Sequence, residues 1–125
     1  MNSRRALLIA ALLLALATLC GALGAHALRT RLPPERLQVW DIAVRWHFLQ
    51  ALGLLGAGLA LRSFESAAVR AAALLLTAGS ALFCGSLYAL SLGAPAAWGV
   101  LTPLGGLAWI AAWLSFAYGI WRHPS

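Results

Sequence analysis

Two histidines stand out chemically in this chain, because each lies in or beside a long apolar run. His26 follows the small-residue stretch that begins at Gly21 and closes the first run, while His47 lies near the start of the second run, with Gln50 three residues later. An imidazole can ligate a metal or haem iron, carry a proton, or hold a hydrogen-bonded network together. Which role applies depends on where the helices bring the two side chains.

No catalytic motif accompanies the histidines. The chain contains no CxxCH or HExxH pattern, and Cys20 and Cys84 stand alone in apolar runs, without a histidine at metal-ligand spacing. It also lacks a nucleophile–base pair, a carboxylate pair and a phosphate-binding glycine loop. We therefore expect no catalytic residue, no metal site and no cofactor, and predict that the protein is not an enzyme.

The composition is that of an integral membrane protein. Of 125 residues, 62% are hydrophobic and only 10% are charged, whereas about a quarter of the residues in soluble domains are charged. The net charge of +6 comes from nine arginines and three acidic residues, and the arginines fall at the ends of apolar runs, where they meet lipid headgroups. Nucleic-acid binding is not expected, because these arginines form no basic face interleaved with aromatic residues.

Four apolar segments are long enough to cross a bilayer, since about 20 apolar residues span its hydrocarbon core as a helix. We predict an all-α fold, an integral membrane four-helix bundle with short loops. The second helix has an amphipathic start, where Asp41 and Arg45 lie one turn apart and neutralise each other. The single membrane domain covers residues 1–125, with spans at about 6–28, 39–61, 71–92 and 100–121. The first run is longer than the apolar part of a signal peptide, so we expect it to be retained.

This topology predicts that polar residues meet near one leaflet, because two spans end and two begin on the side opposite the termini. Polar groups at membrane depth are costly unless they pair or line a wet cavity. The candidate polar cluster or ligand site consists of His26, His47, Gln50, Ser86, Tyr88 and Thr102. Two interpretations are open: a hydrogen-bonded cluster that holds the helices in register, or a small-molecule site.

Small residues at four-residue spacing predict close helix contacts, because helices in lipid associate where backbones can approach each other. Such stripes lie on the first and third spans, and a glycine pair lies near the start of the fourth. The predicted packing residues are Ala17, Gly21, Ala25, Ala81, Gly85, Ala89, Gly105 and Gly106.

The arginines also bear on orientation and partners. Five lie on the side of the termini and four on the other side. Because arginine is enriched in cytoplasmic loops, this narrow excess favours cytoplasmic termini. Membrane lipids are the expected partners, and a membrane-protein partner or a second copy of the chain is left open.

Three stretches together resemble one family of small four-span membrane proteins. They are GALGAHAL at 21–28, GSLYAL at 85–90 and LTPLGGLAWIAAW at 101–113, in the family's order. This is the domain-of-unknown-function 423 family, and the resemblance covers essentially the whole chain. It implies a multi-pass protein of the bacterial plasma membrane and supplies no established activity. Family members usually show a tyrosine followed by glutamine and, three residues later, histidine. This chain instead has Trp46, His47 and Gln50, so the tyrosine is replaced and the histidine and glutamine have exchanged places. That exchange of histidine and glutamine favours a hydrogen-bonded network over metal ligation.

Two functional hypotheses follow. The first is a non-enzymatic structural or accessory membrane protein whose polar cluster organises the bundle and binds a partner or lipid. The second is an accessory factor that binds a small molecule, lipid, quinone or haem through His26 and His47.

Overall fold

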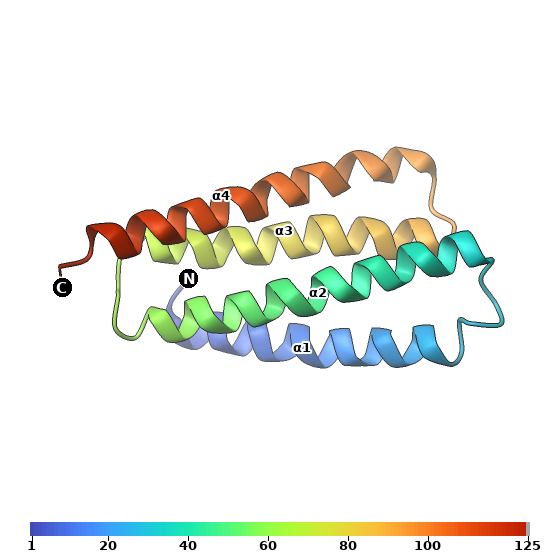
Figure 1. Cartoon of the computed structure of the whole chain (residues 1–125), viewed down its shortest axis with the longest axis horizontal. Coiled ribbons are helices and arrows are strands. Elements are labelled where there is room, and N and C mark those ends of the chain that lie inside the picture. The colour runs from blue at the N-terminus through green and yellow to red at the C-terminus, as the bar shows by residue number, and fades with distance from the viewer. Residues whose placement is uncertain (125) are drawn as a thin grey trace.

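Four antiparallel helices account for most of the chain, of which the computed structural model describes residues 1–124. They are α1 (Ser3–Ala25), α2 (Pro34–Ala60), α3 (Ala67–Ser91) and α4 (Leu101–Arg122), and a short 3-10 helix, η1 (Ala96–Val100), leads into α4. All four, α4 together with η1, are long and apolar enough to cross a membrane. Both ends of the chain lie at the end of the bundle that holds the α2–α3 loop (Figure 1). The predicted all-α membrane bundle is confirmed.

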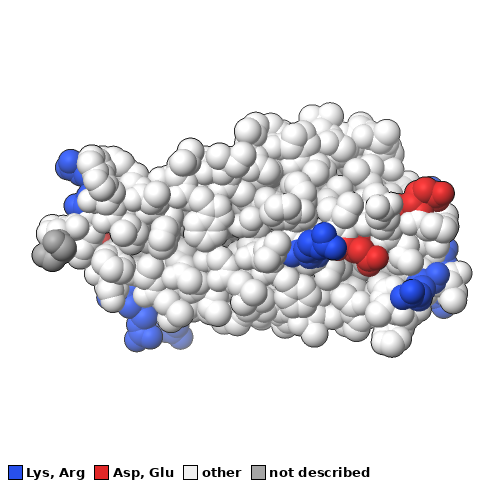
Figure 2. Space-filling model, viewed as in Figure 1, with Lys and Arg blue, Asp and Glu red and all other residues white. Residues whose placement is uncertain are grey.

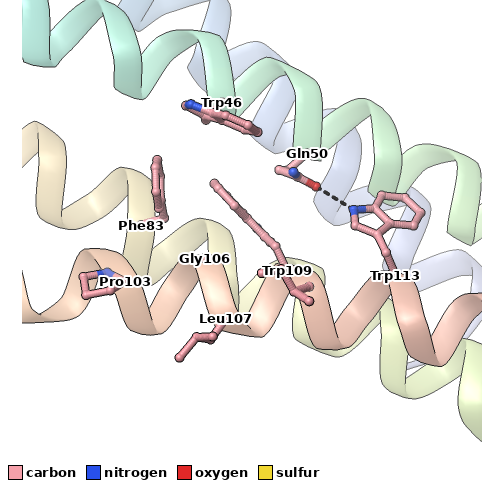
Figure 3. A pocket seen from close by; sticks show the side chains of 9 residues that line it. Trp46, Gln50, Phe83, Pro103, Gly106, Leu107, Trp109 and Trp113 are labelled. Atoms are coloured by element: carbon pink, nitrogen blue, oxygen red, sulfur yellow. Dashed lines mark hydrogen bonds between the residues drawn. The ribbon is translucent and has the colours of Figure 1, made fainter.

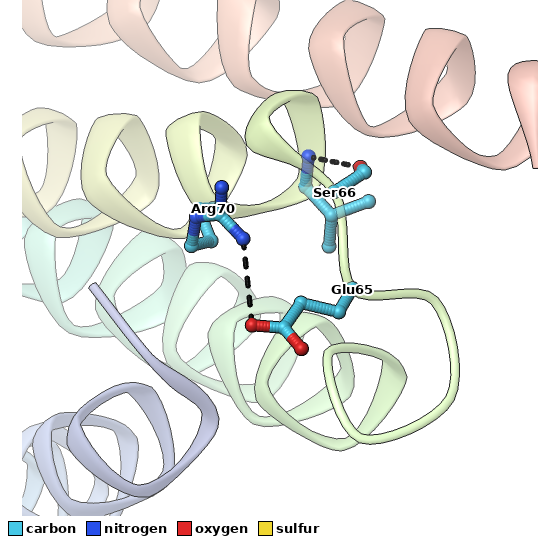
Figure 4. Close-up of polar contacts among 4 residues, drawn as sticks. Glu65, Ser66 and Arg70 are labelled. Carbon is cyan, nitrogen blue, oxygen red and sulfur yellow. Dashed lines mark hydrogen bonds and ion pairs between the residues drawn. The ribbon is translucent and has the colours of Figure 1, made fainter.

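Local sequence signals explain where the helices begin. The Asn2 side chain caps α1 by accepting a hydrogen bond from the backbone N–H of Arg5 at 2.8 Å. Ser66 caps α3 in the same way through the N–H of Val69 (Figure 4). Pro34 occupies the first turn of α2, where its missing N–H would have had no helical partner. Side-chain caps satisfy backbone donors that the first turn leaves unpaired.

The helices differ from the predicted spans mainly at the loop ends. α1 stops at Ala25, before the predicted end at residue 28, and residues 26–32 form turns. α2 extends back to Pro34, so its amphipathic start is continuous with the part that spans. After α3, Gly93 adopts a φ of 102°, which suits glycine at a helix end. Hydropathy overran the end of α1 because Ala27 and Leu28 are apolar, and it missed the first turn of α2 because Glu35 and Arg36 are charged.

The helix interfaces follow chain order: α1 packs against α2, α2 against α3, and α3 against α4 (Figure 1). The α3–α4 interface is the most extensive, whereas α1 and α3 touch only slightly. One cavity therefore opens between α1 and α3, and another opens where side chains of α2 and α4 meet.

The buried face of α1 is made of small residues. It consists of Ala6, Ala10, Ala17, Cys20 and Gly24. Of the stripe predicted on this helix, only Ala17 is fully buried, because Gly21 is half-buried near Val44 and Ala25 is exposed. A strict four-residue spacing drifts about 40° around the helix at each step, so the face that packs moves from Ala17 to Cys20 and Gly24 instead.

Two of the three residues in the stripe predicted on α3 face a cavity rather than a neighbouring helix. Ala81 and Gly85 are exposed, and Ala89 is half-buried. A Cβ placed on Gly85 would meet no atom within 4 Å. The prediction of a helix contact is therefore wrong for Ala81 and Gly85.

The close contact of α3 is with α4, through Gly79 and Gly105. A Cβ on Gly105 would lie 2.5 Å from the backbone nitrogen of Phe83 and 2.8 Å from the carbonyl oxygen of Gly79. Gly106 is half-buried and lines the cavity beside this contact. The two helix backbones thus touch where both residues lack a side chain, as expected for helices that associate in lipid.

The surface is apolar along the bundle and charged near its ends. Charged side chains gather toward both ends in Figure 2, with one blue and red pair set inward from the right-hand end. Leucines such as Leu8 and Leu12 are 58% and 63% exposed. Side chains of this kind between two charged ends face the lipid hydrocarbon.

One ion pair lies at the α2–α3 loop. Nη1 of Arg70 lies 3.5 Å from Oε1 of Glu65, and both side chains are exposed (Figure 4). The pairing expected between Asp41 and Arg45 is not among the ion pairs of residues 1–124, and both of these side chains are exposed. Long side chains near a membrane edge can instead extend their charges toward the headgroups.

Candidate functional site

His47 and Tyr88 form a polar pair within the bundle. His47 lies near the middle of α2 and is only 2% exposed. Its Nδ1 lies 2.8 Å from the hydroxyl oxygen of Tyr88 on α3. Side chains on a helix lean toward its N-terminus, so these two reach toward each other from antiparallel helices. The structure brings these two members of the predicted cluster together.

Ser86 and Thr102 make a separate contact between α3 and α4. Their hydroxyl oxygens lie 2.5 Å apart. The Ser86 hydroxyl donates to the Phe83 carbonyl at 2.9 Å, so Thr102 donates to the Ser86 oxygen. Ser86 is 1% exposed. This pair satisfies its own polar groups and links the start of α4 to α3.

Gln50 faces α4 rather than His47. Its Oε1 accepts a hydrogen bond from Nε1 of Trp113 at 3.1 Å (Figure 3). Residues three positions apart lie about 60° apart around a helix. Because α2 has neighbours on both sides at this level, that angle is enough to direct His47 toward α3 and Gln50 toward α4. Five of the six predicted cluster residues thus fall into three separate pairs, one of which takes Trp113 as a partner from outside the cluster.

His26 lies apart from all three pairs. It is the C-cap residue of α1, its side chain is exposed, and its backbone N–H donates to Ala22. The end of α1 is level with Trp40, because a Cβ on Gly24 would lie 2.8 Å from that indole. His47 lies two turns further along α2, roughly 10 Å deeper. The hypothesis of one site that uses both imidazoles is therefore wrong.

A cavity of about 290 Å³ opens beside His47 between α1 and α3. Its lining includes Leu13 and Leu16 of α1, His47 of α2, and Ser80, Cys84 and Tyr88 of α3. The Nε2 of His47 is buried and has no hydrogen-bond partner within residues 1–124. The backbone carbonyl of Leu13 faces the ring without forming a hydrogen bond that meets ordinary geometry. One ring nitrogen is thus held by Tyr88, and the other is buried and does not reach the surface of the cavity.

Sequence reasoning missed the groups that link α2 to α1 and to α3 beside this pair. Nε1 of Trp40 donates to the Cys20 carbonyl at 2.8 Å, and Sγ of Cys84 contacts the Ala43 carbonyl at 3.6 Å. Trp40 and His47 are seven residues apart, a spacing that places them on one helix face and could have grouped them. Within the described part of the chain, no group of three or more His, Cys, Asp or Glu side chains is arranged to hold a metal.

A larger cavity of about 550 Å³ lies between α2, α3 and α4 (Figure 3). Its aromatic walls are Trp46, Phe83, Trp109 and Trp113, and Gln50 adds an amide. The rings of Trp46 and Trp109 are stacked with centroids 5.9 Å apart, and those of Phe83 and Trp109 are 4.5 Å apart. The cavity therefore presents several aromatic faces and edges.

Two glycines allow the tryptophans to lie so close to the helices. A Cβ on Gly53 would lie 2.5 Å from the Trp113 ring, and a Cβ on Gly79 would lie 2.5 Å from the Trp109 ring. Nε1 of Trp109 donates to the Ser80 hydroxyl at 3.3 Å. Both indoles thus have a hydrogen bond and a glycine beneath them, so their orientation is well defined.

Comparison with known proteins identifies the family. Residues 20–106 match the family described as "Protein of unknown function (DUF423)". The UPF0382 membrane protein YwdK of Bacillus subtilis is 44% identical over 95 residues, which cover 75% of this chain and 77% of the relative. The UPF0382 inner membrane protein YgdD of Escherichia coli is 30% identical over 122 residues, or 98% of this chain and 93% of the relative. No solved structure matches the chain. The chain is a multi-pass protein of the bacterial plasma membrane and belongs to the DUF423 family.

Proposed function

We propose that the protein is a non-enzymatic membrane protein that binds a flat, ring-bearing, lipid-soluble molecule in the aromatic cavity. The observation that carries this proposal is the set of four aromatic side chains around one cavity of about 550 Å³. Ligand sites are commonly apolar pockets of roughly 300–1,000 Å³ with a few polar groups that orient the ligand. The size and the lining of this cavity fit that description.

The position of the cavity indicates that the ligand comes from the bilayer. Leu107 and Ile110 of α4 line it and are 61% and 58% exposed, so it borders the lipid-facing surface. No arginine, aspartate or glutamate is among its lining residues. A charged ligand would therefore lose its hydration without gaining a partner, and the site favours a neutral molecule.

The side chains also favour a ring with a carbonyl group. Aromatic pairs contribute about 0.5–1.5 kcal/mol beyond the burial of apolar surface. Gln50 uses its Oε1 to accept from Trp113, which leaves its amide N–H groups to donate to an acceptor on the ligand. A quinone-type ring combines a flat conjugated face with carbonyl acceptors, and we propose it as the ligand class.

The polar pairs support the non-enzymatic part of the proposal. Each pair joins two helices and uses its groups on each other: His47 with Tyr88, Ser86 with Thr102, and Gln50 with Trp113. None of the three pairs holds a serine, threonine or cysteine nucleophile against an imidazole or carboxylate base, the arrangement most often used in covalent catalysis. They favour a role in holding the helices in register around the cavities.

The test is titration of the protein in nanodiscs with menadione, followed by quenching of tryptophan fluorescence. Ile110→Phe narrows the cavity, whereas Leu114→Phe makes a similar change one turn away on the lipid-facing side of α4, outside the lining. We expect saturable quenching, with a Kd raised about tenfold by Ile110→Phe, equivalent to 1.4 kcal/mol, and unchanged by Leu114→Phe. Quenching that rises linearly and equally in all three proteins would show only partition into the lipid and would refute the proposal.

A further inference from the structure

We infer that one anionic phospholipid binds where α1 begins and α2 ends, with its phosphate between the guanidinium groups of Arg4 and Arg62. These two arginines, together with Ser3 and Leu7, line a cavity of about 390 Å³. The cavity lies at the end of the bundle that holds the α2–α3 loop (Figure 1). It shares no lining residue with the aromatic cavity, so it is a separate site.

A close junction between α1 and α2 fixes the positions from which the two arginines project. The Ser3 hydroxyl donates to the Gly58 carbonyl at 2.7 Å. A Cβ on Gly58 would lie 2.9 Å from Cδ2 of Leu7, so the two helices are packed tightly at this level. Arg4 follows Ser3 in the first turn of α1, and Arg62 lies two residues after the last residue of α2. Both guanidinium groups are therefore carried by well-anchored backbone on either side of one cavity.

The charges around the cavity are all positive. Within residues 1–124, neither Arg4 nor Arg62 belongs to an ion pair, because the ion pair of this region joins Arg70 and Glu65. No aspartate or glutamate is among the lining residues of the cavity. Two like charges around one cavity repel each other unless an anion lies between them. A phosphate fits this position, because the guanidinium fork pairs with two of its oxygens at once.

The membrane position of the cavity indicates that the phosphate belongs to a lipid. Leu7 lines the cavity, and Leu8, one helical turn beyond Arg4, is 58% exposed. Leu59, close to Arg62 on the other helix, is 52% exposed. Exposed leucines on both helices mark the edge of the lipid hydrocarbon. A phosphate held by the arginines thus lies at headgroup level, with apolar walls directly below it for the acyl chains.

The lining also selects the net charge of the headgroup. A zwitterionic lipid brings an ammonium group beside its phosphate, and this cavity offers no carboxylate to receive it. A second cavity at the same end of the bundle, of about 300 Å³, contains both Arg122 and Glu65, so its charges are mixed. The cavity of Arg4 and Arg62 therefore favours a phospholipid whose headgroup is uncharged apart from the phosphate, such as phosphatidylglycerol.

The experiment is native mass spectrometry of the full chain in a neutral detergent, titrated with dioleoylphosphatidylglycerol or with dioleoylphosphatidylcholine. The spectra give the number of bound lipids and the Kd for each lipid. We expect saturable binding of one phosphatidylglycerol, with a Kd about tenfold lower than that of phosphatidylcholine, because two arginines act on its net charge. An excess of inorganic phosphate should not displace this lipid, since free phosphate has no acyl chains to bury.

Four arginine variants with the same change in net charge locate the lipid. Arg4→Gln and Arg62→Gln each remove a guanidinium from the cavity, whereas Arg5→Gln and Arg122→Gln remove one from outside it. We expect the first two variants to raise the Kd for phosphatidylglycerol about tenfold, through loss of a hydrogen bond between charged groups. The other two should change it less than about twofold, because salt screens charges that lie beyond the cavity. Menadione quenching should be unchanged in all four variants, so failure at this site is distinguishable from failure of the proposed function.

Three results would overturn the inference. Equal Kd values for the two lipids would show that the site does not recognise net charge. Equal Kd values for phosphatidylglycerol in Arg4→Gln and Arg5→Gln would show only a general attraction to the positive end of the bundle. Displacement of the lipid by inorganic phosphate would show that the cavity binds a free anion instead of a lipid headgroup.

Discussion

Replacing Gly79 by alanine is expected to destabilise the bundle, whereas the same substitution at Gly85 is expected to stabilise it. Both glycines lie within α3, so the two variants share the same change in composition and helix propensity. They differ in what the new methyl group would meet. At Gly79 it would lie 2.5 Å from Cδ1 of Trp109 and 2.9 Å from the carbonyl oxygen of Gly105, while at Gly85 it would meet nothing within 4 Å.

The magnitudes follow from these distances. Alanine in place of a helical glycine gains roughly 0.5–1 kcal/mol from reduced backbone freedom, and this is the full expected effect at Gly85. At Gly79 the methyl group falls almost 1 Å inside ordinary van der Waals contact, which begins at 3.4 Å. Overpacking of this kind typically costs about 1–3 kcal/mol. The net expectation is a loss of about 0–2.5 kcal/mol at Gly79 and a gain of about 0.5–1 kcal/mol at Gly85.

The assay is reversible unfolding in mixed micelles, with increasing SDS and circular dichroism as the readout, so that each variant yields a free energy of unfolding. Gly105→Ala serves as a third protein, because its methyl group would lie 2.5 Å from the Phe83 backbone nitrogen, which no side-chain rotation can relieve. Its loss should be at least as large as that of Gly79→Ala. Equal changes for Gly79→Ala and Gly85→Ala, or a gain for Gly105→Ala, would refute the close α3–α4 contact.

Removal of the hydroxyl in Tyr88→Phe should lower the free energy of unfolding by about 0.5–1.5 kcal/mol, whereas Tyr118→Phe on the exposed surface should leave it unchanged in the same assay. Thr102→Val should lower the free energy of unfolding by a similar amount, because it breaks the contact with α3. Thr18→Val should leave it unchanged, since the Thr18 hydroxyl donates only within its own helix. Equal losses of stability in these two variants would argue against an interhelical role for Thr102. Glu65→Gln should change stability by less than about 1 kcal/mol, because exposed ion pairs contribute little, and its unfolding curve should overlay that of the wild type. Reporter fusions at the C-terminus and between the first two helices should show a cytoplasmic C-terminus, and a periplasmic signal there would reverse the assignment.

The division of the polar residues shows how far sequence reasoning could go. His47, Tyr88, Gln50, Ser86 and Thr102 are all used in helix-to-helix hydrogen bonds. Their partners could not be predicted, because an angle of about 60° around α2 decides which neighbouring helix a side chain meets. Hydropathy contains no information about which helices flank a given face.

The packing residues show the same limit. Alanine and glycine are so frequent here that four-residue stripes occur on faces that touch no helix, as at Ala81 and Gly85. The glycine pair at 105–106 was marked in the sequence, but nothing there marks Gly79 as the partner of Gly105, although the contact brings two backbones together. Which glycine lies at a crossing depends on the relative position of two helices, a quantity that no single segment encodes.

The sequence alone showed that the chain lies in lipid, and this is enough to determine the fold class. Long apolar runs must form helices in lipid, because every backbone N–H and C=O has to be satisfied within the segment, and Pro33, Pro34 and Ser66 mark where helices begin. Only the tertiary structure showed which polar side chains meet. It moved His26 to the exposed end of α1, paired His47 with Tyr88, and left the other imidazole nitrogen buried without a hydrogen-bond partner among residues 1–124. The physical reason is that side-chain contacts depend on the rotation and offset of neighbouring helices, which are set by packing between segments far apart in the chain.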